Sequence, residues 1–482
     1  MKKITALMLV FIVLVLAVFP ASASGNIPYD SYIYDYWENM VLTPAPYIPG
    51  RSVSGVSLGV GSFSGPQGMC VGADGLIYVA DTGNHRIVVI NAEMTEAVSV
   101  IESFDNNGES DIFSSPYGVT VCRNNLLYVA DSMNQRVVVL DGDRVVKIIS
   151  NPQSEMLDEG FIFTPDKVAV DYADRVYIIA RNMFQGIMVF SPDGDFVGFF
   201  GTINVQISPW QIIWRTLATR AQRERQQLFV PTEFTGIDLD DSGFLYASNI
   251  DSTGMRAVRR LNPSGEDVIR TGENENLGGD LSINAFNNYS GPSYIIDVVY
   301  RGKGIYSLLD SKRGRIFTYD HEGNLLYIFG GLGDMAGTFK QPAAIESFGS
   351  RIAVLDAHRN EIMTFDETSY GRLINEAVGL RFDGDESLAV EKWQQVLLLN
   401  ENLEIANIGI GKAYLTSGDN VNAMKYLKLG QSRIYYSIAY KRYRNEILKD
   451  NLPWIFTGVV ALAVIIPITV VVLKRRKAGR LS

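Results

Sequence analysis

The stretch PQGMCVGADGLIYVADTGNHRIVVIN, residues 66–91, decides the fold because the chain repeats it. A second copy, PYGVTVCRNNLLYVADSMNQRVVVLD, occupies residues 116–141. Asp81 and Asp131 are fifty residues apart, and each is followed by an Asn three residues later and an Arg five residues later. Recurrence of the same apolar runs and polar residues at one spacing indicates a structural period.

Four further units keep this order with less of the polar motif. Within them, short β-rich runs alternate with turn signals such as Asp193-Gly194, as expected between antiparallel strands. Units of this length predict radial repetition, so the predicted fold class is mainly β: a six-bladed β-propeller, then a short all-α segment and one transmembrane helix. The four units span Pro165 to Phe190, Pro231 to Leu261, Pro292 to Tyr319 and Pro342 to Phe365.

These units resemble the NHL family of propeller repeats, whose signature is a Pro-Gly start followed by YVADS-x-N-x-R. The resemblance covers roughly residues 51–369, and the first two units match it almost completely. The repeated polar residues are predicted to be structural: Asp and Asn bond backbone amides at a turn, and Arg ties the turn to a neighbouring blade. They are Asp81, Asn84, Arg86, Asp131, Asn134 and Arg136. For function the resemblance decides little, because such propellers serve as enzymes, binding modules and scaffolds.

Both ends of the chain indicate membrane targeting. Residues 1–24 combine Lys2-Lys3, an apolar run and the small residues Ala21-Ser-Ala23, which predicts a cleaved signal peptide, with an uncleaved anchor helix as the alternative. Residues 454–473 carry no charge and would span about 30 Å as a helix, which predicts a transmembrane helix. Lys-Arg-Arg-Lys follows, so the positive-inside rule places the tail, residues 474–482, in the cytoplasm and the ectodomain outside the cell.

The charge of the chain argues against nucleic acid as a partner. The formal net charge of −10 includes seven cationic residues at the two ends, so the remainder carries −17. Binding to a phosphate backbone depends on clustered Lys and Arg, which an acidic domain does not offer.

Residues 25–50 form an aromatic lead segment ahead of the propeller. Trp37 and Tyr47 in it are candidates for a surface that binds a partner or a sugar. The alternative is that these rings pack onto their own domain, because each buries about 150 to 250 Å².

The prolines of this segment, Pro44, Pro46 and Pro49, are predicted to exclude regular structure from its second half. Residues 52–60 then read as a strand. Because the sixth unit lacks a last strand of its own, we expect residues 52–60 to complete the sixth blade and close the ring.

An insertion at residues 203–229 follows the third unit and has the apolar spacing of a helix. Its candidate binding residues are Trp210, Arg220, Arg223 and Arg225, a basic stretch on an acidic protein. It is either a lid or anion-recognising element, or a solvated helix packed against a blade edge.

From Tyr370 the apolar period becomes helical. Ala389 and Ala423 are 34 residues apart, as are Trp393 and Leu427, and this spacing resembles tetratricopeptide repeats. Residues 370–450 are therefore predicted to hold two such repeats and one more helix. Because fewer than three repeats are marginally stable alone, we expect them to dock against the propeller or continue into the membrane helix.

Few residues indicate catalysis. Propeller lyases with NHL-like repeats hold zinc through a His cluster, whereas only three His are present here, so no metal and no cofactor is predicted. Gluconolactonase-like propellers hold calcium on the axis, for which Asp238, Asp297 and Asn249 would be the candidates. The two cysteines, Cys70 and Cys122, fall in the first strands of adjacent units, and a disulfide between them stays open.

The sequence thus favours a membrane-anchored binding or scaffolding protein at the cell surface. The predicted partner is a protein, with another membrane protein such as a transporter as one option and a glycan as another. A calcium-dependent propeller hydrolase of the lactonase type is the alternative, so the enzyme question stays open with a non-enzyme favoured.

Overall fold

The computed structural model of the protein describes residues 27–157, 160–202, 233–251, 254, 256–273, 276–281 and 291–478. Three of the predicted segments fall outside the described residues. They are the signal peptide (1–24), the insertion (203–229) with Trp210, Arg220, Arg223 and Arg225, and the end of the tail (479–482).

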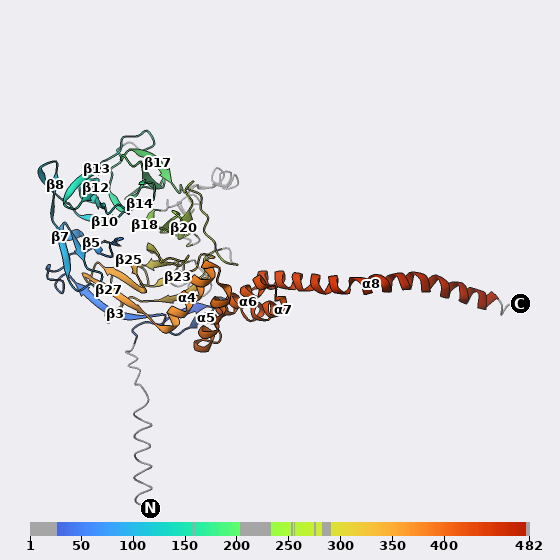
Figure 1. Ribbon diagram of the computed structural model, residues 1–482. Coiled ribbons are helices and arrows are strands. Elements are labelled where there is room, and N and C mark those ends of the chain that lie inside the picture. The colour runs from blue at the N-terminus through green and yellow to red at the C-terminus, as the bar shows by residue number, and fades with distance from the viewer. Residues whose placement is uncertain are drawn as a thin grey trace, which may run out of the picture.

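Six β-sheets surround a central axis in the described part of the chain, and they form the predicted six-bladed propeller (Figure 1). The inner strands of neighbouring blades contact one another in a closed ring, and the sixth returns to the first. In order around the ring these strands are β4 (Gly68–Val71), β10 (Pro116–Val121), β14 (Pro165–Val170), β18 (Phe234–Leu239), β21 (Ile295–Tyr300) and β25 (Pro342–Phe348).

The remaining strands extend each blade outward from its inner strand. The first blade continues with β5 (Ile77–Asp81), β6 (Arg86–Ile90) and β7 (Ala97–Ile101). The second has β11 (Leu127–Asp131), β12 (Arg136–Asp141) and β13 (Arg144–Ile149), with β8 (Ser103–Asn106) and β9 (Glu109–Ile112) at its outer edge. The third has β15 (Val176–Ala180), β16 (Ile187–Phe190) and β17 (Phe196–Phe200).

Among the described residues the fourth blade is shorter than its neighbours, with only β19 (Leu245–Asn249) and β20 (Val258–Leu261) added. The fifth has β22 (Tyr306–Asp310), β23 (Ile316–Tyr319) and β24 (Leu325–Phe329), followed by β1 (Tyr32–Tyr34) and β2 (Met40–Leu42) from the lead segment. The sixth has β26 (Arg351–Asp356), β27 (Glu361–Glu367) and β3 (Tyr47–Ser54).

The second strand of each blade is buried because neighbouring blades cover both of its faces. In β5, Ile77, Val79 and Ala80 are fully buried although their side chains point to different faces of the sheet. The preceding hairpin turns at Asp74-Gly75, where Gly75 adopts φ +78°, a conformation that costs glycine little. The sequence period therefore reflects one packed sheet per unit.

An N-terminal strand does complete the sixth blade, but it lies earlier than predicted. β3 pairs antiparallel with β27, Tyr47 opposite Glu367 and Ser54 opposite Glu361, whereas residues 55–60 form turns. The expectation that Pro49 excludes regular structure is wrong, since Pro49 lies within β3 opposite Phe365. β3 is the outermost strand of its sheet, and an edge strand tolerates proline because one side of its backbone needs no ladder partner.

Five helices follow the propeller in the described residues: α4 (Ser369–Asp383), α5 (Glu386–Leu399), α6 (Glu404–Ser417), α7 (Asn420–Leu429) and α8 (Arg433–Ala478). They pack closely where glycine faces a large side chain, because a Cβ on Gly409 would lie 2.4 Å from Nε1 of Trp393. The pairs α4–α5 and α6–α7 lie within the two predicted repeats, and their assignment as tetratricopeptide repeats stays a prediction.

One hydrophobic core joins the helices to the propeller. It contains Tyr47 and Phe365 of the sixth blade, Phe329 of the fifth, and Ile374 and Trp393 of the helices. The expected docking of the helical segment against the propeller is therefore present.

α8 leaves this body and extends alone (Figure 1). Its first turns pack on α7, and from Ile447 to Leu473 every residue is exposed. Within the described residues it is the one helix long and apolar enough to cross a membrane.

Candidate functional site

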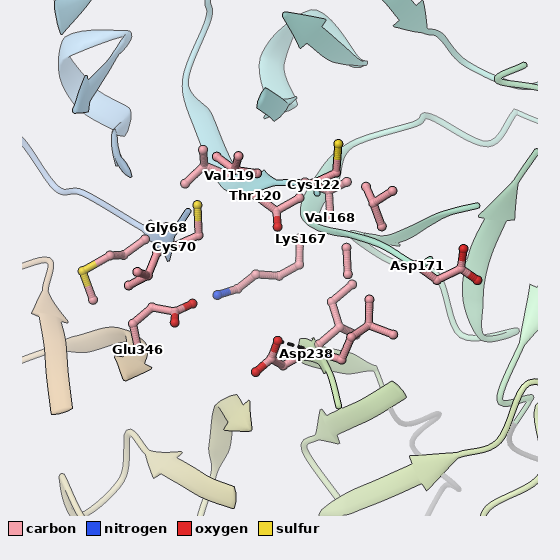
Figure 2. Close-up of a pocket in the computed structure, with 18 of the residues that line it drawn as sticks. Gly68, Cys70, Val119, Thr120, Cys122, Lys167, Val168, Asp171, Asp238 and Glu346 are labelled. Carbon is pink, nitrogen blue, oxygen red and sulfur yellow. Dashed lines mark hydrogen bonds between the residues drawn. The ribbon is translucent and has the colours of Figure 1, made fainter. Parts of the chain in front are cut away.

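The propeller axis contains a polar cavity of about 350 Å³, lined by inner strands of all six blades. Four of the charged residues that line it lie on inner strands: Lys167 on β14, Asp238 on β18, Asp297 on β21 and Glu346 on β25. Figure 2 shows Lys167 extending into the cavity toward the carboxylates of Glu346 and Asp238. Three carboxyl groups and one ammonium thus share a small, partly enclosed space, in which Lys167, Asp238 and Glu346 stay partly exposed.

These groups also tie neighbouring blades together. Lys167 Nζ lies 3.2 Å from Oδ2 of Asp297, and the same oxygen accepts a hydrogen bond of 3.0 Å from the backbone N–H of Ile345 in the next blade. Asp238 accepts one of 2.6 Å from the backbone N–H of Tyr300, again one blade further. The two backbone hydrogen bonds join adjacent inner strands, and the ion pair links the third blade to the fifth, so the charged groups are part of the wall of the propeller.

The cavity favours protonated carboxyl groups. Burial raises the pKa of Asp238 to about 7, and backbone hydrogen bonds from Tyr300 and Leu239 oppose this shift. Burial also raises the pKa of Asp297, against the attraction of Lys167. The pKa of Glu346 lies well above its usual value because of burial and the nearby carboxylates. Asp238 would therefore change charge near neutral pH, whereas the pKa values of Asp297 and Glu346 are raised above their usual range.

The calcium site considered from the sequence does not assemble. Asp238 and Asp297 reach the cavity, but oxygens of both already accept backbone N–H groups, and Asp297 is also paired with Lys167. Asn249 ends β19, and its Nδ2 donates 2.7 Å to the carbonyl of Arg256. Among the described residues no three His, Cys, Asp or Glu side chains converge as metal ligands. This donor set does not fit a calcium ion, which takes six to eight oxygens.

Lys167 and Glu346 were missed in the sequence, although the register of the units marks Lys167. In the first, second and fourth units a glycine occupies the equivalent position, two residues after Pro66, Pro116 and Phe234: Gly68, Gly118 and Gly236. Lys167 and Asp297 occupy this position in the third and fifth units, and they pair with each other. The sixth unit has Ala344 there, so charged residues at a position that is otherwise glycine or alanine were the available signal.

Both cysteines line the same cavity as free thiols. Burial raises the pKa of the Cys70 thiol, with Glu346 the next contribution. A thiol held neutral in this way is a poor nucleophile, because the thiolate is the reactive form.

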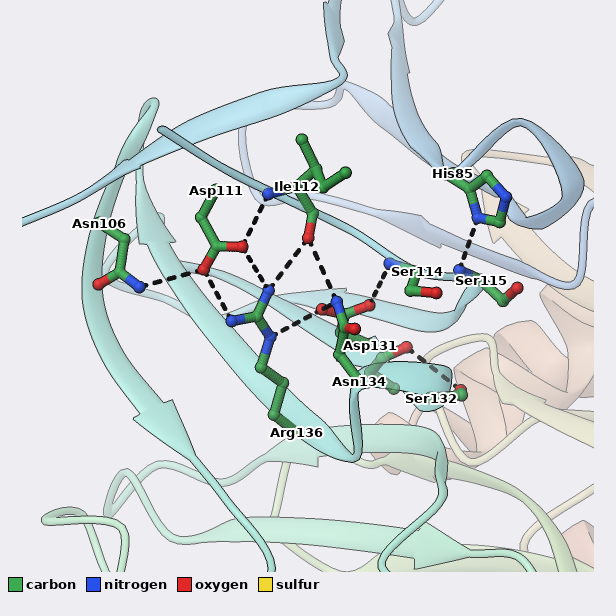
Figure 3. Close-up of polar contacts among 11 residues, drawn as sticks. His85, Asn106, Asp111, Ile112, Ser114, Ser115, Asp131, Ser132, Asn134 and Arg136 are labelled. Carbon is green, nitrogen blue, oxygen red and sulfur yellow. Dashed lines mark hydrogen bonds and ion pairs between the residues drawn. The ribbon is translucent and has the colours of Figure 1, made fainter. Parts of the chain in front are cut away.

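The repeated Asp-x-x-Asn-x-Arg residues form a closed network, best seen in the second blade (Figure 3). Asp131 is fully buried and accepts hydrogen bonds from the Ser114 backbone N–H (2.6 Å), Asn134 Nδ2 (2.9 Å) and Arg136 Nε (2.8 Å). Arg136 also makes a two-pronged contact with Asp111, at 2.7 and 2.9 Å. In the first blade Asp81 accepts hydrogen bonds in the same way from the Ser64 backbone N–H, Asn84 Nδ2 and Arg86 Nε.

The arginines bind the connector that precedes their own blade, not the neighbouring blade. Arg136 reaches Asp111 and the carbonyl of Ile112, and Arg86 reaches the carbonyl of Val60. The link to the next blade is made one residue after the Asp, where Thr82 donates 2.7 Å to the carbonyl of Pro116. Ser132 repeats this link to Pro165.

The two described residues proposed for an aromatic surface have different surroundings. Trp37 is 67% exposed and contacts Tyr36 edge to face, with 5.1 Å between ring centroids. Tyr47 is fully buried in the core between the fifth and sixth blades, stacked 4.9 Å from Phe329. Tyr47 therefore belongs to no exposed surface, and the alternative that the lead segment packs onto its own domain holds for this residue.

A second cleft, of about 620 Å³, lies where the lead segment, residues 271–273 and 276–279, and α6 meet. Its wall includes Glu404, the first residue of α6, whose pKa is raised to about 7 by burial and by Asp35. Lys412 closes one side through an ion pair of 2.7 Å with Glu322. The helices are thus joined to the fifth blade by polar contacts as well as by the apolar core.

Comparison with known proteins identifies the repeat. The NHL repeat profile matches residues 63–90 and 113–140, and no curated protein matches the chain. Solved structures similar to the chain include virginiamycin B lyase from Staphylococcus aureus, at 12% identity and TM-score 0.40, covering 66% of this chain and 99% of that one. A structural-genomics target assigned as a gluconolactonase has 14% identity and TM-score 0.40, covering 68% and 94%. At these TM-scores neither likeness carries an argument about function.

Proposed function

We propose that this chain, which carries NHL repeats on a six-bladed propeller, is a membrane-anchored binding and scaffolding protein. The observation that supports this proposal most directly is the course of α8. One continuous helix begins packed on α7 and ends in an exposed apolar segment, residues 454–473, of membrane-spanning length. The propeller is thereby attached to a bilayer through a helical body that shares its core.

The proposed orientation places the propeller outside the cell and the basic C-terminal end in the cytoplasm. Lys474 and Arg476 follow the apolar segment directly, which the positive-inside rule assigns to the cytoplasmic side. The proposed partner is another protein of the same membrane, such as a transporter, and a cell-surface glycan is the second candidate ligand.

The polar chemistry of the propeller supports binding over catalysis. The repeated Asp, Asn and Arg residues are engaged in turn and connector contacts, and the axial carboxylates bond to backbone N–H groups and Lys167. A hydrolase of the lactonase type would need a metal held by convergent oxygens, which the donor set on the axis of the described propeller does not provide.

Two measurements test this function. Protease added to intact cells should degrade the propeller and spare only the membrane-embedded C-terminal part, whereas a protected propeller would contradict the orientation. Affinity capture of the full chain from detergent-solubilised native membranes should co-purify a specific membrane protein. Replacement of residues 370–473 by an unrelated anchor should abolish this capture. Stoichiometric calcium with lactone turnover and no partner would refute the proposal.

A further inference from the structure

Residues 433–453 of α8, here called the stalk, separate the helical body from the apolar segment. One side of the stalk is held by α7: Tyr435, Tyr436 and Ala439 pack in the core shared with α7. Below them, Arg442 Nη1 donates 2.9 Å to the carbonyl of Leu415, and Glu446 accepts 2.6 Å from Asn420 Nδ2. At about 100° per residue these positions share one face of the helix. The other side of the helix faces the cleft at Ile434, whose backbone N–H bonds Glu273, and from Ile438 onward it is unoccupied in the described structure.

That opposite face carries a regular apolar seam. Its positions alternate in spacing between four and three residues, which is the heptad period of helices that pack side by side. Four of the six are apolar and substantially exposed: Ile434 (53%), Ile438 (38%), Leu448 (47%) and Leu452 (61%). The complete seam is Ile434, Ile438, Lys441, Asn445, Leu448 and Leu452.

The charges of the stalk are divided between its faces. Lys441 lies in the seam, and Arg444 and Lys449 lie beside it on either flank, all exposed. None of these three makes an ion pair with any described residue. Glu446 and Asp450 lie toward the α7 side, where Glu446 is occupied by Asn420. The free face is therefore apolar at both ends of the seam, polar between them at Lys441 and Asn445, and exclusively basic in its charge.

We propose that this seam is the docking face for an acidic amphipathic helix of a neighbouring membrane protein, which runs alongside the stalk. The proposal rests on the membrane-anchored function proposed above and names the chemistry of its partner. An apolar stripe of the same period would cover Ile438 and Leu448, and flanking Asp or Glu would pair with Lys441, Arg444 and Lys449.

Charge argues against a second copy of this chain as the occupant. Two stalks side by side would bring Arg444 and Lys449 against the same cations of the other copy, without acids on that face to balance them. Like charges across a helix interface select against that partner. A helix with the opposite charge relieves the repulsion and buries the same apolar surface.

Geometry argues against a lipid surface. The seam runs over about 27 Å, from Ile434 to Leu452, at 1.5 Å per residue. The stalk continues into the apolar segment as one helix (Figure 1), so if residues 454–473 cross the bilayer, the stalk extends away from it and does not lie along it. Only its last turn reaches the headgroups, so most of the seam faces the space beside the stalk.

Site-specific photo-crosslinking in native membranes tests the proposal with the full chain. Adjacent residues provide a matched pair: Leu448 lies in the seam, whereas Ile447 has a similar exposure of 42% and points about 100° away. A photoreactive amino acid at Leu448 should crosslink a membrane protein, and the same amino acid at Ile447 should not. Mass spectrometry of the crosslinked peptide should show an apolar heptad stripe flanked by Asp and Glu.

Charge reversal tests whether the basic residues of the stalk contribute to binding of the partner helix. Lys441→Glu with Arg444→Glu should lower the crosslink yield at Leu448 on the order of tenfold or more, since like charges across an interface cost several kcal/mol. The control is Lys425→Glu with Lys428→Glu on α7, which changes the net charge equally away from the seam. It should leave the yield unchanged.

Several outcomes would overturn the inference. They are a crosslink to a second copy of the chain, a crosslink only to lipid, equal yields at Ile447 and Leu448, or a partner peptide without acidic residues. If affinity purification captures a partner but Leu448 gives no crosslink, the docking face on the stalk is refuted and the proposed function stays intact. Absence of the chain from the membrane fraction would refute the function itself.

Discussion

Tyr47 joins three parts of the molecule, and its removal is predicted to destabilise the full chain. Its ring stacks on Phe329 of the fifth blade, while its hydroxyl donates 3.3 Å to Glu367 of the sixth. The same hydroxyl accepts hydrogen bonds from Arg301 and from Asn375 of α4. We expect Tyr47→Ala to cost about 3 to 5 kcal/mol, the usual range for deleting a buried aromatic ring.

Tyr47→Phe separates the hydroxyl from the ring. It keeps the stacking but removes one acceptor of the buried Arg301 guanidinium, which retains the Tyr327 hydroxyl at 2.8 Å. We expect a loss of about 1 to 3 kcal/mol, the cost of a buried polar group left without its partner.

Guanidinium chloride unfolding of the detergent-solubilised full chain, followed by near-ultraviolet circular dichroism, measures these differences. Trp37→Ala is the control, because Trp37 belongs to the same lead segment but is exposed, and we expect a change within about 0.5 kcal/mol. If Tyr47→Ala and Trp37→Ala unfold at the same denaturant concentration, the lead segment does not lock the fifth and sixth blades.

Three further predictions concern charge. Arg136 holds the pKa of Asp111 at about 2, so this stabilisation is complete above pH 4 and is lost as the pH falls toward 2. Arg136→Met should remove that part of the acid transition. It should also cost about 3 to 5 kcal/mol of unfolding free energy at neutral pH, because it leaves the buried carboxylate of Asp131 without its cation. An unchanged acid titration would contradict this prediction. The pKa of Glu404 is raised to about 7, so its contribution to stability is present at pH 5 and is lost as the pH rises through 7. In thermal melts Glu404→Gln should flatten this dependence, and a wild-type slope would exclude Glu404 as its source. Lys167→Met should destabilise more at pH 8 than at pH 5, because Asp297 then loses its cation, and adding Asp297→Leu should recover most of the loss. Equal melting of the single and double variants would show that the pair is not coupled.

The propeller could be predicted from the sequence because each blade repeats the same physical requirements. Residues 77–81 and 127–131 form buried second strands in both copies, and the turn that follows needs the same Asp, Asn and Arg contacts each time. A feature that occurs in every unit can be read from the period alone. The closing strand followed the same logic, since a blade without its last strand needs one from elsewhere.

The contents of the axis could not be read in this way because they depend on contacts between blades. A Cβ on Gly68 would lie 2.2 Å from the carbonyl oxygen of Tyr117, which shows how closely inner strands approach and why glycine fills this position. Lys167 and Asp297 replace it in two units that are distant in sequence, and only the closed ring shows that they pair. Tyr47 was misjudged for a related reason: Ile48 beside it is exposed, and its partners Arg301, Phe329 and Asn375 lie some 250 to 330 residues away.

The helical segment shows how a marginal repeat can serve as a rigid connection. Two helical pairs offer too few layers to bury their own apolar faces, yet Ile374, Trp393 and Ile410 are buried because the fifth and sixth blades supply the missing layer. Since α8 begins within this body and is held by Asn420 and Leu415, the direction of the stalk is set by the propeller. A partner helix bound along the stalk would therefore be placed at a fixed position relative to the blades, so the propeller face above it would be the next surface available for contact.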